Sequence, residues 1–129
     1  MSNHRILIVD DDASVRRVIA RTFEREGFEV GIAANGIKAI DLLTEGHFDV
    51  MISDIDMPEM GGKELCQHLV TKGPYLPQHT LIVTSHTEIN IRAWIDQYPG
   101  VRMVEKPIGP RQLLRTVNEL IASGASTAP

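Results

Sequence analysis

The sequence contains only one cysteine, Cys66, and it has no excess of basic residues. A single cysteine cannot form a disulfide bond within the chain, so this absence predicts a reducing compartment, the cytoplasm. Thirteen lysines and arginines are outnumbered by seventeen aspartates and glutamates, which gives a net charge of −4. This balance argues against nucleic acids and anionic membranes as partners, because both are bound through concentrated positive charge.

Long apolar runs are absent near the start of the chain. The first run, residues 6–9, is only four residues long, which is too short for the core of a signal peptide or for a membrane span. The five histidines have no spacing typical of metal ligands, so no zinc site is expected. A length of 129 residues and an ordinary globular composition predict one domain.

Two kinds of apolar pattern alternate along the chain. Short continuous apolar runs bounded by polar residues are typical of strands buried on both faces. Between them, apolar residues recur with the period of a helix. The predicted strands are residues 6–9, 28–33, 50–52, 81–83 and 101–104, and the predicted helices are residues 13–26, 36–45, 62–72, 87–98 and one that begins near Pro110.

Strands that alternate with single helices require parallel pairing and right-handed crossovers. Five such units in a chain of this length predict an α/β fold, a three-layer α/β/α sandwich with five helices. Its five-stranded parallel sheet is expected in the flavodoxin-like order 2-1-3-4-5. The domain is expected over residues 1–122, and residues 123–129 are expected to be a disordered tail or the stub of a linker.

Chemically active residues stand at the carboxyl ends of the predicted strands. Asp10 and Asp11 come after the first strand, and Asp54 comes after the third. Thr84 closes the fourth strand, and Lys106 follows the fifth. In an open parallel sheet the ligand crevice lies outside these ends, so the five side chains are expected to converge.

Carboxylates in a partly desolvated crevice repel each other, by about 4 kcal/mol for a pair ~4 Å apart at an effective dielectric of ~20. A bound cation relieves this repulsion, and Mg²⁺, or the similar Mn²⁺, suits ligands that are all oxygen atoms. Asp12, the third acidic residue of the run, has a simpler role as the cap of the following helix. The sequence therefore predicts a magnesium site at the strand ends.

A crevice of this kind can carry phosphoryl chemistry. Beside a metal ion and a lysine, Asp54 can attack phosphorus and form an acyl phosphate. Phosphoryl transfer chiefly requires charge neutralisation and in-line positioning, which the metal ion and Lys106 can supply. Thr84 can donate a hydrogen bond to a phosphoryl oxygen after the transfer.

Four segments of the chain resemble the motifs of the receiver domain of bacterial two-component response regulators. Each motif is weak alone, but the four in this order and spacing form a specific signal. The resemblance covers about residues 4–122 and is to stand-alone, chemotaxis-regulator-like receivers. The segments are Ile6-Leu-Ile-Val-Asp-Asp11, Ser53-Asp-Ile-Asp-Met-Pro58, Val83-Thr84-Ser85 and Glu105-Lys-Pro107.

The resemblance implies a role for each acidic residue. Asp54 is implied to be the phosphoacceptor and, together with Asp10 and Asp11, to hold Mg²⁺. The backbone carbonyl of Asp56 is implied as a further metal ligand. The implied phosphoryl donor is a phosphohistidine on a sensor histidine kinase or on a histidine phosphotransfer protein.

The resemblance also implies roles for the later strand ends. Lys106 is implied to pair with the phosphoryl group, and its peptide bond to Pro107 is implied to be cis, a form that costs an X-Pro bond little. Thr84 is implied to move toward the phosphoryl group and to change the face formed by the fourth helix, the fifth strand and the fifth helix. A downstream protein effector bound there in trans is expected, unless the tail leads to another domain. No catalytic turnover of a separate substrate is expected.

The chain departs from the family pattern before the lysine and after the phosphorylation loop. Met103 lies three residues before the lysine, where the family usually has an aromatic residue, and it offers neither a ring nor a hydroxyl for an aromatic rotamer switch. Gly61-Gly62 replaces the usual Asp-Gly, and this glycine pair is expected to loosen the start of the third helix.

Two loop residues border the path of a water molecule that would hydrolyse the phosphoryl group. They are Asp56, two positions after the phosphoacceptor, and His86, two positions after the switch threonine. We predict that both side chains tune the lifetime of the phosphoryl group, and that His86 does so in response to pH, because the unperturbed pKa of histidine is near 6.5. The alternative is that both are solvated loop residues.

Two other functions remain open from the sequence. Asp54-Ile-Asp56 imitates the Asp-x-Asp motif of haloacid-dehalogenase-type phosphatases, although the residues that usually follow that motif are missing and the chain is short for a cap. A pseudo-receiver that binds partners without phosphorylation is the second alternative. The complete set of acids, threonine and lysine argues against it.

Overall fold

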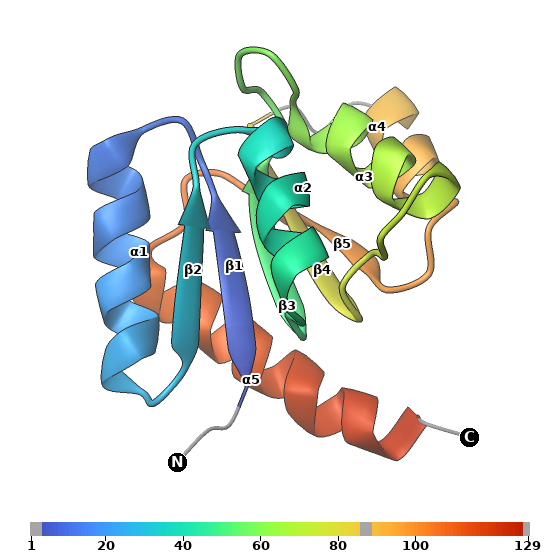
Figure 1. The fold of residues 1–129 in the computed structure, drawn as a ribbon. Coiled ribbons are helices and arrows are strands. Elements are labelled where there is room, and N and C mark those ends of the chain that lie inside the picture. The colour runs from blue at the N-terminus through green and yellow to red at the C-terminus, as the bar shows by residue number, and fades with distance from the viewer. Residues whose placement is uncertain (1–3, 86–88, 128–129) are drawn as a thin grey trace.

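The computed structural model describes residues 4–85 and 89–127. Its elements are β1 (Arg5–Val9), α1 (Ala13–Arg25), β2 (Glu29–Ala33), α2 (Gly36–Glu45), β3 (Val50–Asp54), α3 (Gly62–Thr71), β4 (His79–Thr84), α4 (Ile89–Ile95), β5 (Val101–Glu105) and α5 (Pro110–Thr127). The five strands are parallel and lie in the order β2-β1-β3-β4-β5. Helices α1 and α5 cover one face of the sheet, and α2 and α3 cover the other (Figure 1). The predicted α/β/α sandwich, strand order and helices are therefore confirmed.

The central strands are apolar because both of their faces are buried. In β1, Ile6, Leu7, Ile8 and Val9 are each at most 1% exposed. Leu7 and Val9 join the core cluster on the side of α2 and α3, whereas Ile6 and Ile8 join the cluster on the side of α1 and α5. This two-sided burial explains why a continuous apolar run, and not an alternating one, marks these strands.

Asp12 caps the start of α1, which confirms its predicted role. Its carboxylate accepts hydrogen bonds from the backbone N–H groups of Ser14 and Val15 at 2.9 and 3.2 Å. The C-cap of the helix is Glu26, and Gly27 follows with a φ of 91°, a left-handed conformation that glycine adopts without strain. The helix is thus fixed at both ends, and its start holds the acidic loop at the end of β1.

Helix α5 continues to Thr127, past the predicted domain boundary at residue 122. The backbone of residues 123–127 is helical, and the domain boundary at residue 122 with a tail or linker stub after it stays a prediction. No proline lies between Pro110 and Pro129, and Gly124 costs the helix only about 1 kcal/mol relative to alanine, so no strong helix breaker stands at residue 122. Even with this extension, no helix of the described chain combines the length and hydropathy that a membrane span requires.

Candidate functional site

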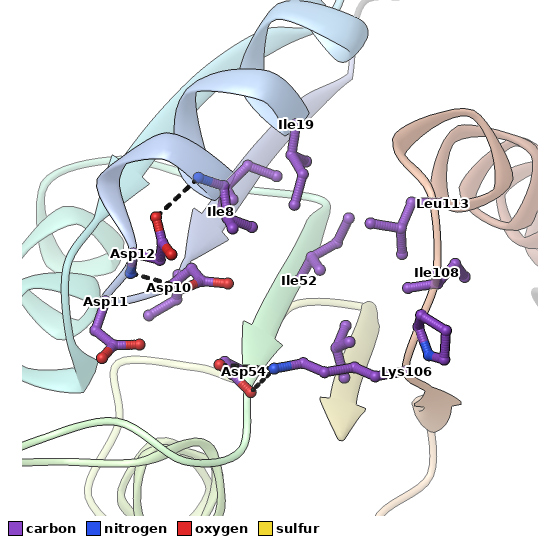
Figure 2. Close-up of a pocket in the computed structure, with 14 residues that line it drawn as sticks. Ile8, Asp10, Asp11, Asp12, Ile19, Ile52, Asp54, Lys106, Ile108 and Leu113 are labelled. Atoms are coloured by element: carbon purple, nitrogen blue, oxygen red, sulfur yellow. Dashed lines mark hydrogen bonds and ion pairs between the residues drawn. The ribbon is translucent and has the colours of Figure 1, made fainter. Parts of the chain in front are cut away.

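The carboxyl ends of the strands meet in one pocket, as the sequence predicts. Asp10 and Asp11 follow β1, Asp54 ends β3 and Lys106 follows β5, and Figure 2 shows their side chains directed into the same space. The pocket has a volume of about 500 Å³, and apolar side chains of β1, β3 and α5 form its inner wall. The predicted convergence of acids and lysine is thus present in the structure.

Asp54 and Lys106 form an ion pair at the mouth of this pocket. The Nζ atom of Lys106 lies 3.0 Å from Oδ1 and 3.1 Å from Oδ2 of Asp54, so it contacts both carboxylate oxygens. The Asp54 side chain is only 10% exposed, whereas the lysine side chain is 40% exposed. The Lys106 amide donates a hydrogen bond of 2.8 Å to the Thr84 carbonyl, which anchors the lysine to the end of β4. A buried carboxylate requires a compensating charge, and Lys106 supplies it from the solvent side.

Three carboxylates share this single ammonium group. Asp10, Asp11 and Asp54 each present an oxygen atom, and these atoms all lie within 4.8 Å of one another. Burial raises the pKa of Asp10 above its usual value of 3.8, and the charge of Asp54 raises it further. Three negative charges against one positive charge leave an excess that a divalent cation can neutralise. Because every donor is a carboxylate oxygen, the site fits Mg²⁺ or Mn²⁺.

The substitution Asp10→Asn is expected to stabilise the metal-free protein at neutral pH. Because the fold raises the pKa of Asp10, the folded protein binds that proton more tightly than the unfolded chain does. Stability is therefore lost as the pH rises through the raised pKa, and the loss persists at neutral pH. Asparagine removes this loss, yet its oxygen can still accept the 2.9 Å hydrogen bond from the Asp12 amide.

Urea unfolding in EDTA measures this effect. The urea midpoint of the variant should exceed that of the wild type at neutral pH and should match it below pH 3.8, where the carboxyl group is protonated in both states. In saturating Mg²⁺ the wild type should instead have the higher urea midpoint, since it then gains the free energy of metal binding. A difference between the two urea midpoints that does not change with pH would show that the raised pKa of Asp10 is not its cause.

Thr84 and Met103 lie on the neighbouring strands β4 and β5, and neither lines the pocket, so the predicted convergence includes the acids and the lysine but not the Thr84 side chain. Thr84 is fully buried at the end of β4. Met103 is half-buried on β5, where it is in register with Ile82 and packs against the core on the side of α2 and α3. A flexible thioether fills space at this position but brings no aromatic ring or hydroxyl to the strand.

Pro107, Asp56 and His86 complete the set of predicted site residues. Pro107 lines the pocket, and its peptide bond with Lys106 is cis, as the resemblance implies. Asp56 is exposed on the loop after β3, and the role of its backbone carbonyl as a metal ligand stays a prediction. His86 lies outside the described residues, so its effect on the phosphoryl lifetime also stays a prediction.

Gly61 and Gly62 hold the loop after β3 close to the strand, whereas the sequence predicts that they loosen the start of α3. A Cβ atom on Gly62 would lie 2.6 Å from the backbone oxygen of Asp54, and one on Gly61 would lie 2.5 Å from that of Ile55. The Gly62 amide donates a hydrogen bond of 3.0 Å to the Ile55 carbonyl. These close backbone approaches leave no room for a side chain, so the glycine pair helps to position Asp54.

The same loop is tied to the start of α2, a contact that the sequence does not predict. The side-chain amide of Asn35 donates to Oε2 of Glu59 at 3.1 Å, while its oxygen caps α2 by accepting from the Lys38 amide at 2.9 Å. The Gly36 amide donates to the Met60 carbonyl at 3.0 Å. An Asn-Gly pair before a helix signals a cap in the sequence, but it does not reveal a partner 24 positions away.

Comparison with known proteins agrees with this geometry. Residues 6–118 match the family described as the response regulator receiver domain. The Response regulator MprA of Mycobacterium sp. (strain KMS) is 32% identical over 122 residues, which cover 91% of this chain and 50% of the relative. The chain therefore spans about half the length of the curated relatives that it matches.

Solved structures share the fold over almost their whole length. A response regulator receiver domain protein (CheY-like) from Methanospirillum hungatei JF-1 matches with a TM-score of 0.83 at 28% identity, covering 98% of this chain and 100% of that chain. The chemotaxis response regulator CheY4 of Vibrio cholerae matches with a TM-score of 0.81 at 29% identity, covering 92% of this chain and 99% of that chain. Both similarities therefore extend over more than nine-tenths of this chain.

Proposed function

Because this chain belongs to the receiver-domain family of response regulators, we propose that it is a switch in which Asp54 accepts a phosphoryl group. One observation carries the proposal: the buried Asp54 pairs with Lys106 at 3.0 Å beside the carboxylates of Asp10 and Asp11. Receiver domains are signalling domains and not classical enzymes. The proposed chemistry is accordingly limited to the gain and loss of the domain's own phosphoryl group.

The proposed transfer is a displacement at the phosphorus atom of a phosphohistidine, carried by a sensor histidine kinase or a histidine phosphotransfer protein. A carboxylate oxygen of Asp54 attacks phosphorus, the P–N bond breaks, and the imidazole nitrogen keeps the electron pair and takes up a proton. Lys106, already beside Asp54, neutralises the incoming phosphoryl oxygens. When bound, Mg²⁺ supplies further charge neutralisation at these oxygens. Its proposed ligands are Asp10, Asp11, Asp54 and the backbone carbonyl of Asp56.

The phosphoryl group would replace a single carboxylate charge with a more highly charged group that has more acceptor oxygens. Thr84, at the end of the neighbouring strand, would donate its hydroxyl hydrogen to this group and shift the loop that leads to α4. The face formed by α4, β5 and α5 would then bind a downstream protein in trans. We place this switch in the cytoplasm, where kinases that use ATP act.

Trp94 on α4 offers a spectroscopic reporter for the switch. It is the only tryptophan of the chain, it is 6% exposed, and Nζ of Lys63 lies 5.8 Å from its ring centroid. Beryllofluoride with Mg²⁺, which imitates the phosphoryl group, is expected to change the emission of Trp94 as α4 shifts. An unchanged spectrum, with unchanged amide signals around Asp54 and Thr84, would favour the pseudo-receiver.

Labelling with acetyl phosphate tests the proposed function. With Mg²⁺, the chain is expected to take up a single phosphoryl group. Removal of the metal with EDTA is expected to abolish labelling, because the uncompensated carboxylates then repel the anionic donor. Labelling that persists in EDTA would contradict a metal-dependent site, and steady hydrolysis of p-nitrophenyl phosphate would support the haloacid-dehalogenase-type phosphatase instead.

A further inference from the structure

A second groove lies between α1 and the edge strand β2, which run side by side at the left of the sheet in Figure 1. The groove has a volume of about 400 Å³ and shares no lining residue with the acidic pocket. It is therefore a separate surface, and the phosphorylation chemistry does not account for it. Its lining consists of Ala13, Arg16, Arg17, Ala20, Arg21, Glu24, Val30 and Ile32.

The outer edge of β2 is open, because within the described residues this strand pairs with β1 alone. The Glu29 amide donates to the His4 carbonyl, and the Ala33 carbonyl accepts from the Asp10 amide, both at 3.1 Å. Since successive residues of a strand direct their backbone groups to opposite edges, those of Val30 and Ile32 point outward. An open edge of this kind can pair with an extended segment of another chain.

The side chains beside this edge provide an apolar contact. Ile32 is 51% exposed, although it lies in a strand of the sheet, and Val30, two positions earlier, lines the same groove. Ala20 of α1 is buried beneath the groove with a small side chain that leaves the space open. A partner strand could therefore bury an apolar side chain against Ile32.

The groove is also positively charged on a protein whose net charge is −4. Three arginines and one glutamate line it, which gives the lining a net charge of +2. The guanidinium of Arg16 is engaged, since it donates to the Asp10 carbonyl at 2.7 Å. Arg17 and Arg21, in contrast, form no ion pair with any carboxylate of the described residues. Charge complementarity therefore favours an acidic occupant.

We propose that this groove binds an extended acidic segment of a partner protein, which adds to the outer edge of β2 as a further strand. Its backbone pairs with Val30 and Ile32, an apolar side chain covers Ile32, and its carboxylates meet Arg17 and Arg21. This interaction does not require phosphorylation of Asp54. The groove thus gives the protein a second docking surface beside the switch face.

A labelled peptide of alternating glutamate and valine residues is the probe. Its fluorescence anisotropy should show binding to the wild type that weakens with added salt, because surface ion pairs are screened. The double substitution Arg17→Ala/Arg21→Ala should weaken binding by about tenfold, the upper range for two exposed ion pairs. Arg111→Ala/Arg115→Ala on α5 removes the same charge elsewhere and should leave binding nearly unchanged.

Amide hydrogen exchange tests the proposed strand pairing. On peptide binding, the amides of Val30 and Ile32 should gain protection, whereas that of Glu29, already bonded to β1, should change little. Both arginine variants should unfold cooperatively in urea and still be labelled by acetyl phosphate, which verifies their fold independently of binding.

Three outcomes would overturn the inference. Equal loss of binding in the α1 and α5 double variants would show that only overall charge matters. Binding without protection of Val30 and Ile32 would exclude strand addition. A dimer of the free protein that dissociates on Arg17→Ala/Arg21→Ala substitution would make a second copy of this chain, and not an acidic partner, the occupant of the groove.

Discussion

Asp54→Asn is expected to lower labelling by acetyl phosphate by at least about a thousandfold, as loss of an essential nucleophile does in enzymes. The amide has nearly the same shape as the carboxylate, but it carries no negative charge with which to attack phosphorus. Lys106 keeps an oxygen to contact at this position, so the pocket should keep its form. Mass spectrometry of the protein incubated with Mg²⁺ and acetyl phosphate measures the loss.

Asp56→Asn is the matched control for this substitution. Asp56 lies two residues further along, its side chain is exposed, and only its backbone carbonyl is a proposed metal ligand. This variant should therefore keep most of the labelling. If Asp54→Asn were labelled as rapidly as the wild type, the phosphoacceptor would instead be Asp10 or Asp11, whose carboxylate oxygens belong to the same cluster. Borohydride reduction of the acyl phosphate and peptide mapping would identify which carboxylate carries the group.

Gly62→Ala is expected to destabilise the protein by about 1–3 kcal/mol, the usual cost of overpacking. The new Cβ atom would lie 2.6 Å from the backbone oxygen of Asp54, and neither backbone can move without disturbing the end of β3. Helix propensity predicts the opposite sign, because alanine favours a helix over glycine by about 1 kcal/mol. The sign of the change in urea unfolding free energy therefore shows whether overpacking or helix propensity dominates. Labelling by acetyl phosphate should also slow, because the substitution displaces Asp54.

Gly36→Ala is the control for the glycine substitution. Its Cβ atom would lie 2.6 Å from Cγ of Met60, which belongs to a flexible side chain and not to the backbone. Both glycines begin a helix, so the two variants gain similar helix propensity. Gly36→Ala should therefore cost clearly less free energy than Gly62→Ala. If Gly62→Ala were neutral or stabilising, the close approach to Asp54 would not constrain the loop.

The strand order and the acidic pocket could be predicted because each depends on short, local signals. A run such as Ile6–Val9 marks a strand buried on both faces, and alternation with helices then fixes parallel pairing. Once the pairing is known, topology alone brings Asp10, Asp54 and Lys106 to one edge of the sheet. No side-chain detail is required for that step, so this part of the site could be found from the sequence.

The loop after β3 could not be predicted in the same way, because contacts between distant segments determine its course. Asn35 and Glu59 meet across 24 positions, and neither residue type signals the other. Gly62 looks flexible in the sequence, yet the nearby backbone of Asp54 requires a glycine there. The end of α5 is hard to place from the sequence for another reason. Residues 123–127 have no apolar pattern, yet none of them is a residue that must end a helix.

The two residues of the Asp54–Lys106 ion pair are synthesised at different times. The two residues are 52 positions apart, and Lys106 follows the last strand to be made. During synthesis, the ribosome therefore releases every carboxylate of the site before the ammonium group that balances them. A nascent chain that ends at residue 85 would contain Asp10, Asp11 and Asp54 but not the ammonium group of Lys106. Under the proposed function, the domain should accept a phosphoryl group only when β5 has joined the sheet and brought Lys106 to Asp54.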